Sequence, residues 1–137
     1  MFYFLTNGIN TVLILLVAAA PLLPQPKRRN NGAIEFWLRS LLGIGIGVVL
    51  AETGKRIVLW PGHPSFPSGH ETLALAAGVC LVVRSPRWAA AAVPIAALQA
   101  WALVAGHFHR PIDIAGALIT GILPPLGCHL WKRSSAS

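Results

Sequence analysis

Charge is scarce in this chain of 137 residues: charged side chains make up 11% of it, against about 25% in soluble domains. Cysteine is scarce too. Cys80 and Cys128 each lie inside an apolar run and form no CxxC pair, which argues against a thiolate zinc site and favours buried thiols over a disulfide. No basic residue precedes Lys27, so the N-terminus lacks the charged start of a cleaved signal peptide and favours a retained first span.

Apolar residues supply 55% of the chain and occur in long runs, a pattern typical of polytopic membrane proteins. We therefore predict an all-α fold, a membrane helical bundle of about five transmembrane helices. It would form a single integral membrane domain over residues 1–137. The expected spans are residues 4–23, 34–53, 68–83, 88–106 and 111–130.

The net charge of +7 carries information on orientation. The basic residues lie at the ends of apolar runs and form no stripe with interleaved aromatics, so no nucleic-acid partner is expected. Loop 25–32, turn 84–87 and the C-terminal tail hold seven of them, and the opposite side holds three. The positive-inside rule then predicts a cytoplasmic C-terminus, with the other side facing the periplasm or exterior of a bacterial inner (plasma) membrane.

Polar residues inside the spans carry packing predictions. Glu35 and Arg39 are four residues apart and should pair near the membrane surface. Glu52 needs a cationic partner, for which the neighbouring Lys55 or Arg56 is nearest in sequence. Gln99 must likewise find a hydrogen-bond partner. Glycines at positions 43, 45 and 47 should allow another helix to approach closely.

The stretch Pro67-Ser68-Gly69-His70-Glu71 has the features of a helix start that can hold an anion. Ser68 is a good N-cap, and Glu71 three residues later completes a capping-box pattern. The free N–H groups of the first turn and the helix dipole favour phosphate, and Gly69 permits close approach. His70 adds a side chain that titrates near neutral pH. The alternative is a capped helix with a surface histidine.

The second stretch is His109-Arg110-Pro111-Ile112-Asp113. Pro111 suits the first turn of a helix, which places His109 and Asp113 on one face. A carboxylate there accepts a hydrogen bond from one imidazole nitrogen and leaves the other free as nucleophile or base. The alternative is a structural His–Asp pair that caps the helix.

Both helix starts are expected on the same side of the membrane, together with four of the five histidines. Two histidines with different roles suit phosphate transfer without a metal, because one attacks phosphorus and the other protonates the leaving oxygen. Basic residues on that side would stabilise the charge of the phosphoryl transition state. These residues are Lys55, Arg56 and Arg110.

These motifs resemble the type-2 phosphatidic acid phosphatase superfamily of membrane lipid phosphatases. The family's second block, Pro-Ser-Gly-His, is intact at residues 67–70, and its third block ends as His109-x3-Asp113. The first block, Lys-x6-Arg-Pro, is altered to Arg56-x6-His63-Pro64. The Ser-Arg that opens the third block falls on Ala102-Leu103. The resemblance covers about residues 52–120.

The resemblance implies a metal-independent hydrolase that needs no cofactor. His109 would be the nucleophile that forms a phosphohistidine, Asp113 would orient it, and His70 would be the general acid. The substrate phosphate would be bound by residues that match or adjoin the family's blocks: Arg56, Lys55, His63, Ser68, Gly69, Arg110 and His107.

The expected function is hydrolysis of a lipid phosphate or diphosphate at the outer membrane face. Candidate substrates are an isoprenoid carrier diphosphate, phosphatidylglycerophosphate, phosphatidate and a lipid A phosphate. The expected partners are this substrate and membrane lipids, with a homodimer as the alternative to a monomer. Because the family's arginines are missing, a weak or inactive lipid-phosphate-binding member is one alternative. A divalent-metal site built from the outer histidines and Asp113 is another.

Overall fold

The computed structural model describes residues 1–24 and 32–131, and these form five α-helices without a strand. Short 3₁₀ turns at Ala20–Leu22 and Pro86–Trp88 follow the first helix and precede the fourth. The all-α prediction is confirmed, and every helix end lies within four residues of the predicted span. The helices are α1 (Phe2–Ala19), α2 (Ala33–Arg56), α3 (Gly69–Arg84), α4 (Ala89–Ala105) and α5 (Pro111–Leu130).

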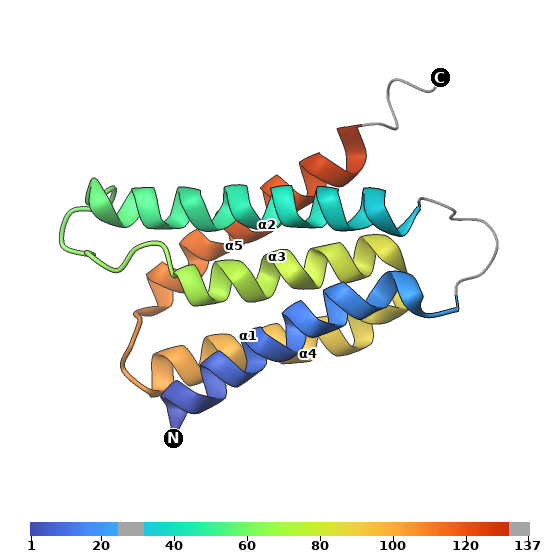
Figure 1. Cartoon of the computed structure of the whole chain (residues 1–137). Helices are drawn as coiled ribbons and strands as arrows, with labels where there is room; N and C mark the ends of the chain where they lie inside the picture. Colours follow the sequence, from blue (N-terminus) through green and yellow to red (C-terminus); the bar gives the residue numbers. More distant parts are fainter. Residues whose placement is uncertain (25–31, 132–137) are drawn as a thin grey trace.

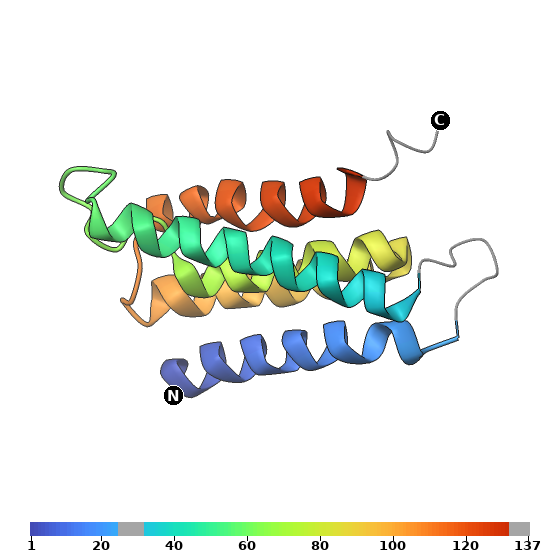
Figure 2. The same cartoon turned by 45° about the horizontal axis from the view of Figure 1, so that its top comes forward.

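Successive helices run in opposite directions along one bundle (Figures 1 and 2). The starts of α1, α3 and α5 therefore lie at the same end of the bundle as the last turns of α2 and α4 (Figure 1). The loops 57–68 and 106–110 connect helices at this end. The topology thus gathers the two predicted motifs at one end.

Four helical segments are long and apolar enough to cross a membrane: Phe2–Leu22, Ala33–Arg56, Pro86–Ala105 and Pro111–Leu130. The 16 residues of α3 span only about 24 Å at 1.5 Å per residue, less than the ~30 Å hydrocarbon core. However, α3 packs against each of the other four helices. The shortest helix is therefore the central one, and its start lies where the bundle can enclose a site.

Small side chains allow the helices to pack closely around α3. Its buried residues include several alanines, Gly78 and Cys80. On α2, a Cβ at Gly43 would collide with Pro125, and one at Gly47 would collide with the carbonyl oxygen of Thr120. Close approach of α5 is confirmed at these two glycines. It is not found at Gly45, which faces open space.

The remaining packing predictions have mixed outcomes. Arg39 Nη2 lies 2.8 Å from Glu35 Oε1, which confirms that ion pair. Lys55 Nζ lies 2.6 Å from Glu52 Oε1, which identifies the partner of the acid at the end of α2. The prediction for Gln99 is wrong, since this fully buried amide has no side-chain hydrogen bond to any described residue. Both cysteines are free thiols.

Candidate active site

The starts of α3 and α5 are joined directly through their backbones. The amide of Ser68 donates to the carbonyl oxygen of Asp113 at 3.0 Å. Beside this bond, Gly116 leaves room for Phe66 and Pro67, because a Cβ there would collide with the Phe66 ring. The two sequence motifs, about 40 residues apart in the chain, therefore meet in the fold.

The start of α3 is capped as predicted, but only by half of a capping box. Ser68 is fully buried, and its Oγ accepts a hydrogen bond from the Glu71 amide at 3.3 Å. The reciprocal bond to the Ser68 amide is replaced by the bond from that amide to Asp113. The Ser68 hydroxyl hydrogen can still donate to an anion, since a hydroxyl both donates and accepts.

Asp113 holds the start of α5 together from a fully buried position. Its Oδ2 accepts from Ser65 Oγ at 2.8 Å and from the Arg110 amide at 2.9 Å. The same oxygen lies 3.3 Å from Nδ1 of His109, so the predicted His–Asp pair is present. With Nδ1 facing a carboxylate, we assign the proton to Nδ1 and the free lone pair to Nε2.

The loop before α5 fixes the backbone of His109. The amides of Phe108 and His109 both donate to the carbonyl oxygen of Leu103, at 3.0 and 3.2 Å. The side chain of Leu103 is only 1% exposed and belongs to the core. The family pattern has an arginine at position 103. In this chain the backbone of Leu103 supports His109, the candidate nucleophile, and its buried side chain cannot contact a phosphate.

The charge state of His109 is set by burial and by its neighbours. Burial lowers the pKa of this imidazole, the hydrogen bond and charge of Asp113 raise it, and the charges of Lys55 and of His70 in its protonated form lower it further. The net effect is a pKa below the ordinary value, so His109 is neutral at neutral pH. Burial and the charge of Lys55 also lower the pKa of His70.

The cation at the start of α3 is Lys55. A Cβ on Gly69 would lie 2.7 Å from Glu52 Oε1 and 3.1 Å from Lys55 Nζ, so the ion pair rests directly on this glycine. Gly69 thus leaves room for two side chains of α2, and the expected approach of a phosphate to its backbone stays a prediction. Glu52 holds the ammonium in place and offsets part of its charge.

Other residues predicted to bind phosphate lie farther out. Arg56, His107 and Arg110 are exposed. His63 is half-buried with its ring edge against Trp60 at a centroid distance of 5.9 Å, and its Nδ1 has no partner among the described residues. The two connected helix starts thus bring together the following predicted site residues: Lys55, Ser68, Gly69, His70, His109 and Asp113. The catalytic and phosphate-binding roles of these and of the outer four residues stay predictions.

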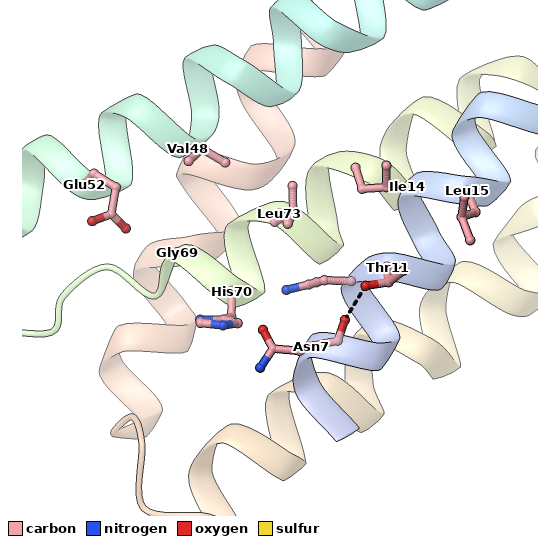
Figure 3. Close-up of a pocket in the computed structure, with 10 residues that line it drawn as sticks. Asn7, Thr11, Ile14, Leu15, Val48, Glu52, Gly69, His70 and Leu73 are labelled. Atoms are coloured by element: carbon pink, nitrogen blue, oxygen red, sulfur yellow. Dashed lines mark hydrogen bonds between the residues drawn. The ribbon is translucent and has the colours of Figure 1, made fainter. Parts of the chain in front are cut away.

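A groove of about 490 Å³ opens beside His70 between α1, α2 and α3 (Figure 3). Its wall on α1 includes the polar residues Asn7, Asn10 and Thr11, and the amide of Asn7 is directed toward the imidazole of His70 (Figure 3). We did not predict this groove from the sequence. Polar residues at positions i, i+3 and i+4 of an apolar span were the available signal.

The sequence analysis also missed Ser65, because its contact with Asp113 joins residues 48 positions apart in the sequence.

The divalent-metal site considered as an alternative function has no matching cluster of side chains among the described residues. Within residues 1–24 and 32–131, no three His, Cys, Asp or Glu side chains gather closely enough to hold an ion.

The sequence matches the family model described as the PAP2 superfamily over residues 24–135. The matched region contains α2 to α5 and both helix starts, and it is wider than the predicted 52–120. Helix α1 lies outside it. Neither the curated proteins nor the solved structures gave a match.

Proposed function

The chain belongs to the PAP2 superfamily, and we propose that it is an integral membrane phosphatase that hydrolyses a lipid phosphate or diphosphate through a phosphohistidine. One observation carries this proposal. His109 pairs through Nδ1 with the buried carboxylate of Asp113, and the carbonyl oxygen of Asp113 accepts from the Ser68 amide at the start of α3, where His70 and the ammonium of Lys55 from α2 lie. This arrangement combines an oriented nucleophile, an anion-binding helix start and a second titratable group.

In the first step, the lone pair of His109 Nε2 attacks phosphorus and forms an N–P bond. The bond from phosphorus to the lipid oxygen breaks, and His70 gives its proton to that oxygen. Amides of the first turn of α3 and the Lys55 ammonium would stabilise the charge on the other phosphate oxygens. Asp113 stabilises the positive charge that develops on the His109 ring.

In the second step, water hydrolyses the phosphohistidine. His70, now neutral, accepts a proton from the attacking water, whose oxygen bonds to phosphorus as the N–P bond breaks. Inorganic phosphate leaves, and His109 returns to its neutral form with the proton still on Nδ1. His70 is again protonated, so the cycle closes without a metal or another cofactor.

The site would face the periplasm or exterior of a bacterial inner membrane, with the C-terminus in the cytoplasm, as the distribution of basic residues predicts. Candidate substrates remain an isoprenoid carrier diphosphate, phosphatidylglycerophosphate, phosphatidate and a lipid A phosphate. The second candidate function is lipid-phosphate binding with weak or no catalysis. The buried Leu103 side chain, at a position where the family pattern has arginine, favours it.

The test is phosphate release by the purified full chain from vesicles that carry each candidate lipid, with His109→Ala beside the wild type. We expect release by the wild type, a loss of at least 10³-fold in the variant, and an acid-labile phosphoprotein in the wild type only. If no lipid yields phosphate while the chain still binds vanadate, the binding function replaces the enzymatic one.

A further inference from the structure

A second groove, of about 500 Å³, lies at the end of the bundle opposite the candidate active site. It lies between the end of α1 and the turn that joins α3 to α4, and both are found at this end of the bundle (Figures 1 and 2). Its volume is within the range of roughly 300–1,000 Å³ that is usual for ligand sites. No residue of the candidate active site lines this second groove.

Arg87 gives the second groove a positive charge that no acid offsets. Its side chain is exposed, lines the groove and makes no ion pair with a described residue. The whole sequence has only four acids: two are ion-paired on α2, and two are buried in the first turns of α3 and α5. The charge of the groove therefore favours an anion, and a guanidinium is suited to bind a phosphate with two hydrogen bonds.

The backbone of the turn fixes the residues on either side of Arg87. The Ser85 amide donates to the carbonyl oxygen of Leu81 at 2.9 Å, and the Trp88 amide donates to the carbonyl oxygen of Ser85 at 3.0 Å. Trp88 also packs against the hydrophobic core with part of its side chain. The Ser85 hydroxyl does not cap the helical segment that follows, so it can donate to a ligand in the groove. The turn thus offers a hydroxyl and a guanidinium to the same groove.

The rest of the lining is apolar and lies at the ends of two predicted membrane spans. The apolar side chains come from the end of α1 and the start of α4: Leu23, Pro24, Ala90 and Ala91. The segments Phe2–Leu22 and Pro86–Ala105 are both long and apolar enough to cross a membrane, and the groove lies where they end and begin. Arginine and tryptophan at such positions are typical of the layer of lipid head groups. A ligand of the groove would therefore combine a negative charge with an apolar part.

We propose that the second groove binds the head group of an anionic phospholipid, with the phosphate on Arg87 and Ser85 and the first chain carbons beside Leu23. This end of the bundle is the predicted cytoplasmic one, and basic pockets between helices on that side suit anionic head groups. A neutral phosphatidylcholine fits less well, because its quaternary ammonium is repelled by the guanidinium. The proposal does not depend on the proposed phosphatase function.

A lipid in this groove would join two parts of the bundle. The end of α1 lies outside the region that matches the family model, and the turn between α3 and α4 lies within it. Because the groove exists only when both parts are in place, a lipid that binds there stabilises the folded chain in proportion to its occupancy. Binding and thermal unfolding should therefore respond to the same lipid.

The test measures lipid binding to the purified full chain in neutral detergent micelles by native mass spectrometry. Phosphatidylglycerol is the anionic probe, and phosphatidylcholine with the same chains is the neutral one. We expect one phosphatidylglycerol to bind about tenfold or more tightly than phosphatidylcholine, as hydrogen bonds to a charged group allow. The unfolding temperature should rise with the phosphatidylglycerol concentration.

Variants locate this binding in the groove. Arg87→Gln should weaken phosphatidylglycerol binding about tenfold or more, and Arg87→Lys should weaken it less, since lysine keeps the charge but loses the fork. Ala90→Glu places a negative charge on an exposed lining residue and should abolish the preference for phosphatidylglycerol. Arg133→Gln is the matched control, because it removes the same charge from the C-terminal tail, outside the described residues. It should lose no more than about fivefold, the diffuse attraction of one basic side chain to anionic lipid.

Equal binding of the two lipids by the wild type would overturn the proposal. Equal losses in Arg87→Gln and Arg133→Gln would also overturn it, because they would indicate diffuse surface charge instead of a site. If inorganic phosphate displaces phosphatidylglycerol at the same concentration as the lipid itself does, the groove binds any phosphate and the lipid assignment is wrong. Phosphate release from lipid substrates is a separate measurement, so each of these results leaves the phosphatase function untouched.

Discussion

Replacing Asp113 with asparagine separates the catalytic role of this residue from its structural one. Three donors converge on Oδ2: Ser65 Oγ, the Arg110 amide and His109 Nδ1. The Arg110 N–H is fixed by the backbone and would clash with an NH₂ group, so the asparagine must place its carbonyl oxygen at the Oδ2 position. All three hydrogen bonds then survive, and only the negative charge is lost.

The magnitude follows from that geometry. Hydrogen bonds to charged groups contribute roughly 1.5–3 kcal/mol and neutral ones about 0.5–1.5, so three weakened bonds lower the free energy of unfolding by about 3–4.5 kcal/mol. The catalytic loss is larger, because the charge is needed most when the His109 ring becomes positive. Removing such a preorganised partner costs on the order of 10²–10⁴ in kcat.

The assay is phosphate release under saturating lipid, with thermal unfolding measured on the same preparations. Ser65→Ala is the matched control, because it removes one donor from the same oxygen and keeps the charge. It should lower kcat by roughly two- to tenfold. If Asp113→Asn lowers the unfolding temperature but keeps kcat within about threefold of the wild type, Asp113 is a structural cap and the orienting role is refuted.

Three further predictions concern pH and close contacts. Burial lowers the pKa of His109, which attacks as the neutral ring, and burial and Lys55 lower the pKa of His70, which must be protonated to act as the acid. The plot of kcat/KM against pH should therefore be bell-shaped with its maximum below neutral pH, and a rate that keeps rising through pH 7 contradicts the assignment. Because Asp113 raises the pKa of His109, Asp113→Asn should move the acidic limb to lower pH. Gly69→Ala should lower kcat/KM at least tenfold by displacing the ion pair, whereas Gly8→Ala, in open space, should keep wild-type rates. Gly116→Ala should reduce the free energy of unfolding by about 1–3 kcal/mol in thermal or denaturant unfolding, because its methyl group would meet an aromatic ring.

The parts of the site that sequence could predict are local. His109 and Asp113 are four residues apart at a helix start, so helix geometry alone brings them together. The choice between Lys55 and Arg56 depended on where α2 ends. We expected the span to stop at residue 53, but the helix continues to Arg56, and the phase of its last turn directs Lys55 toward Gly69.

Contacts between distant segments could not be predicted in this way. Ser65 reaches Asp113 only because loop 57–68 folds back onto α5, and no periodicity in the sequence encodes that return. The stripe of Asn7, Asn10 and Thr11 was visible as a pattern, but its role depends on which helix lies opposite. Gln99 is a case in which a general rule failed. Buried amides are expected to have a hydrogen-bond partner, but the Gln99 side chain has none among the described residues.

The number of cationic side chains near the phosphate site connects the altered family motif with the choice of substrate. At position 103 the backbone still positions His109, while the leucine side chain packs into the core and offers no charge. The phosphate would then be stabilised by the first turn of α3 and by Lys55, whose charge Glu52 partly offsets. Protonated His70 would have to act as both acid and counter-charge. A site with so few cations stabilises the charge of a monoester better than that of a diphosphate.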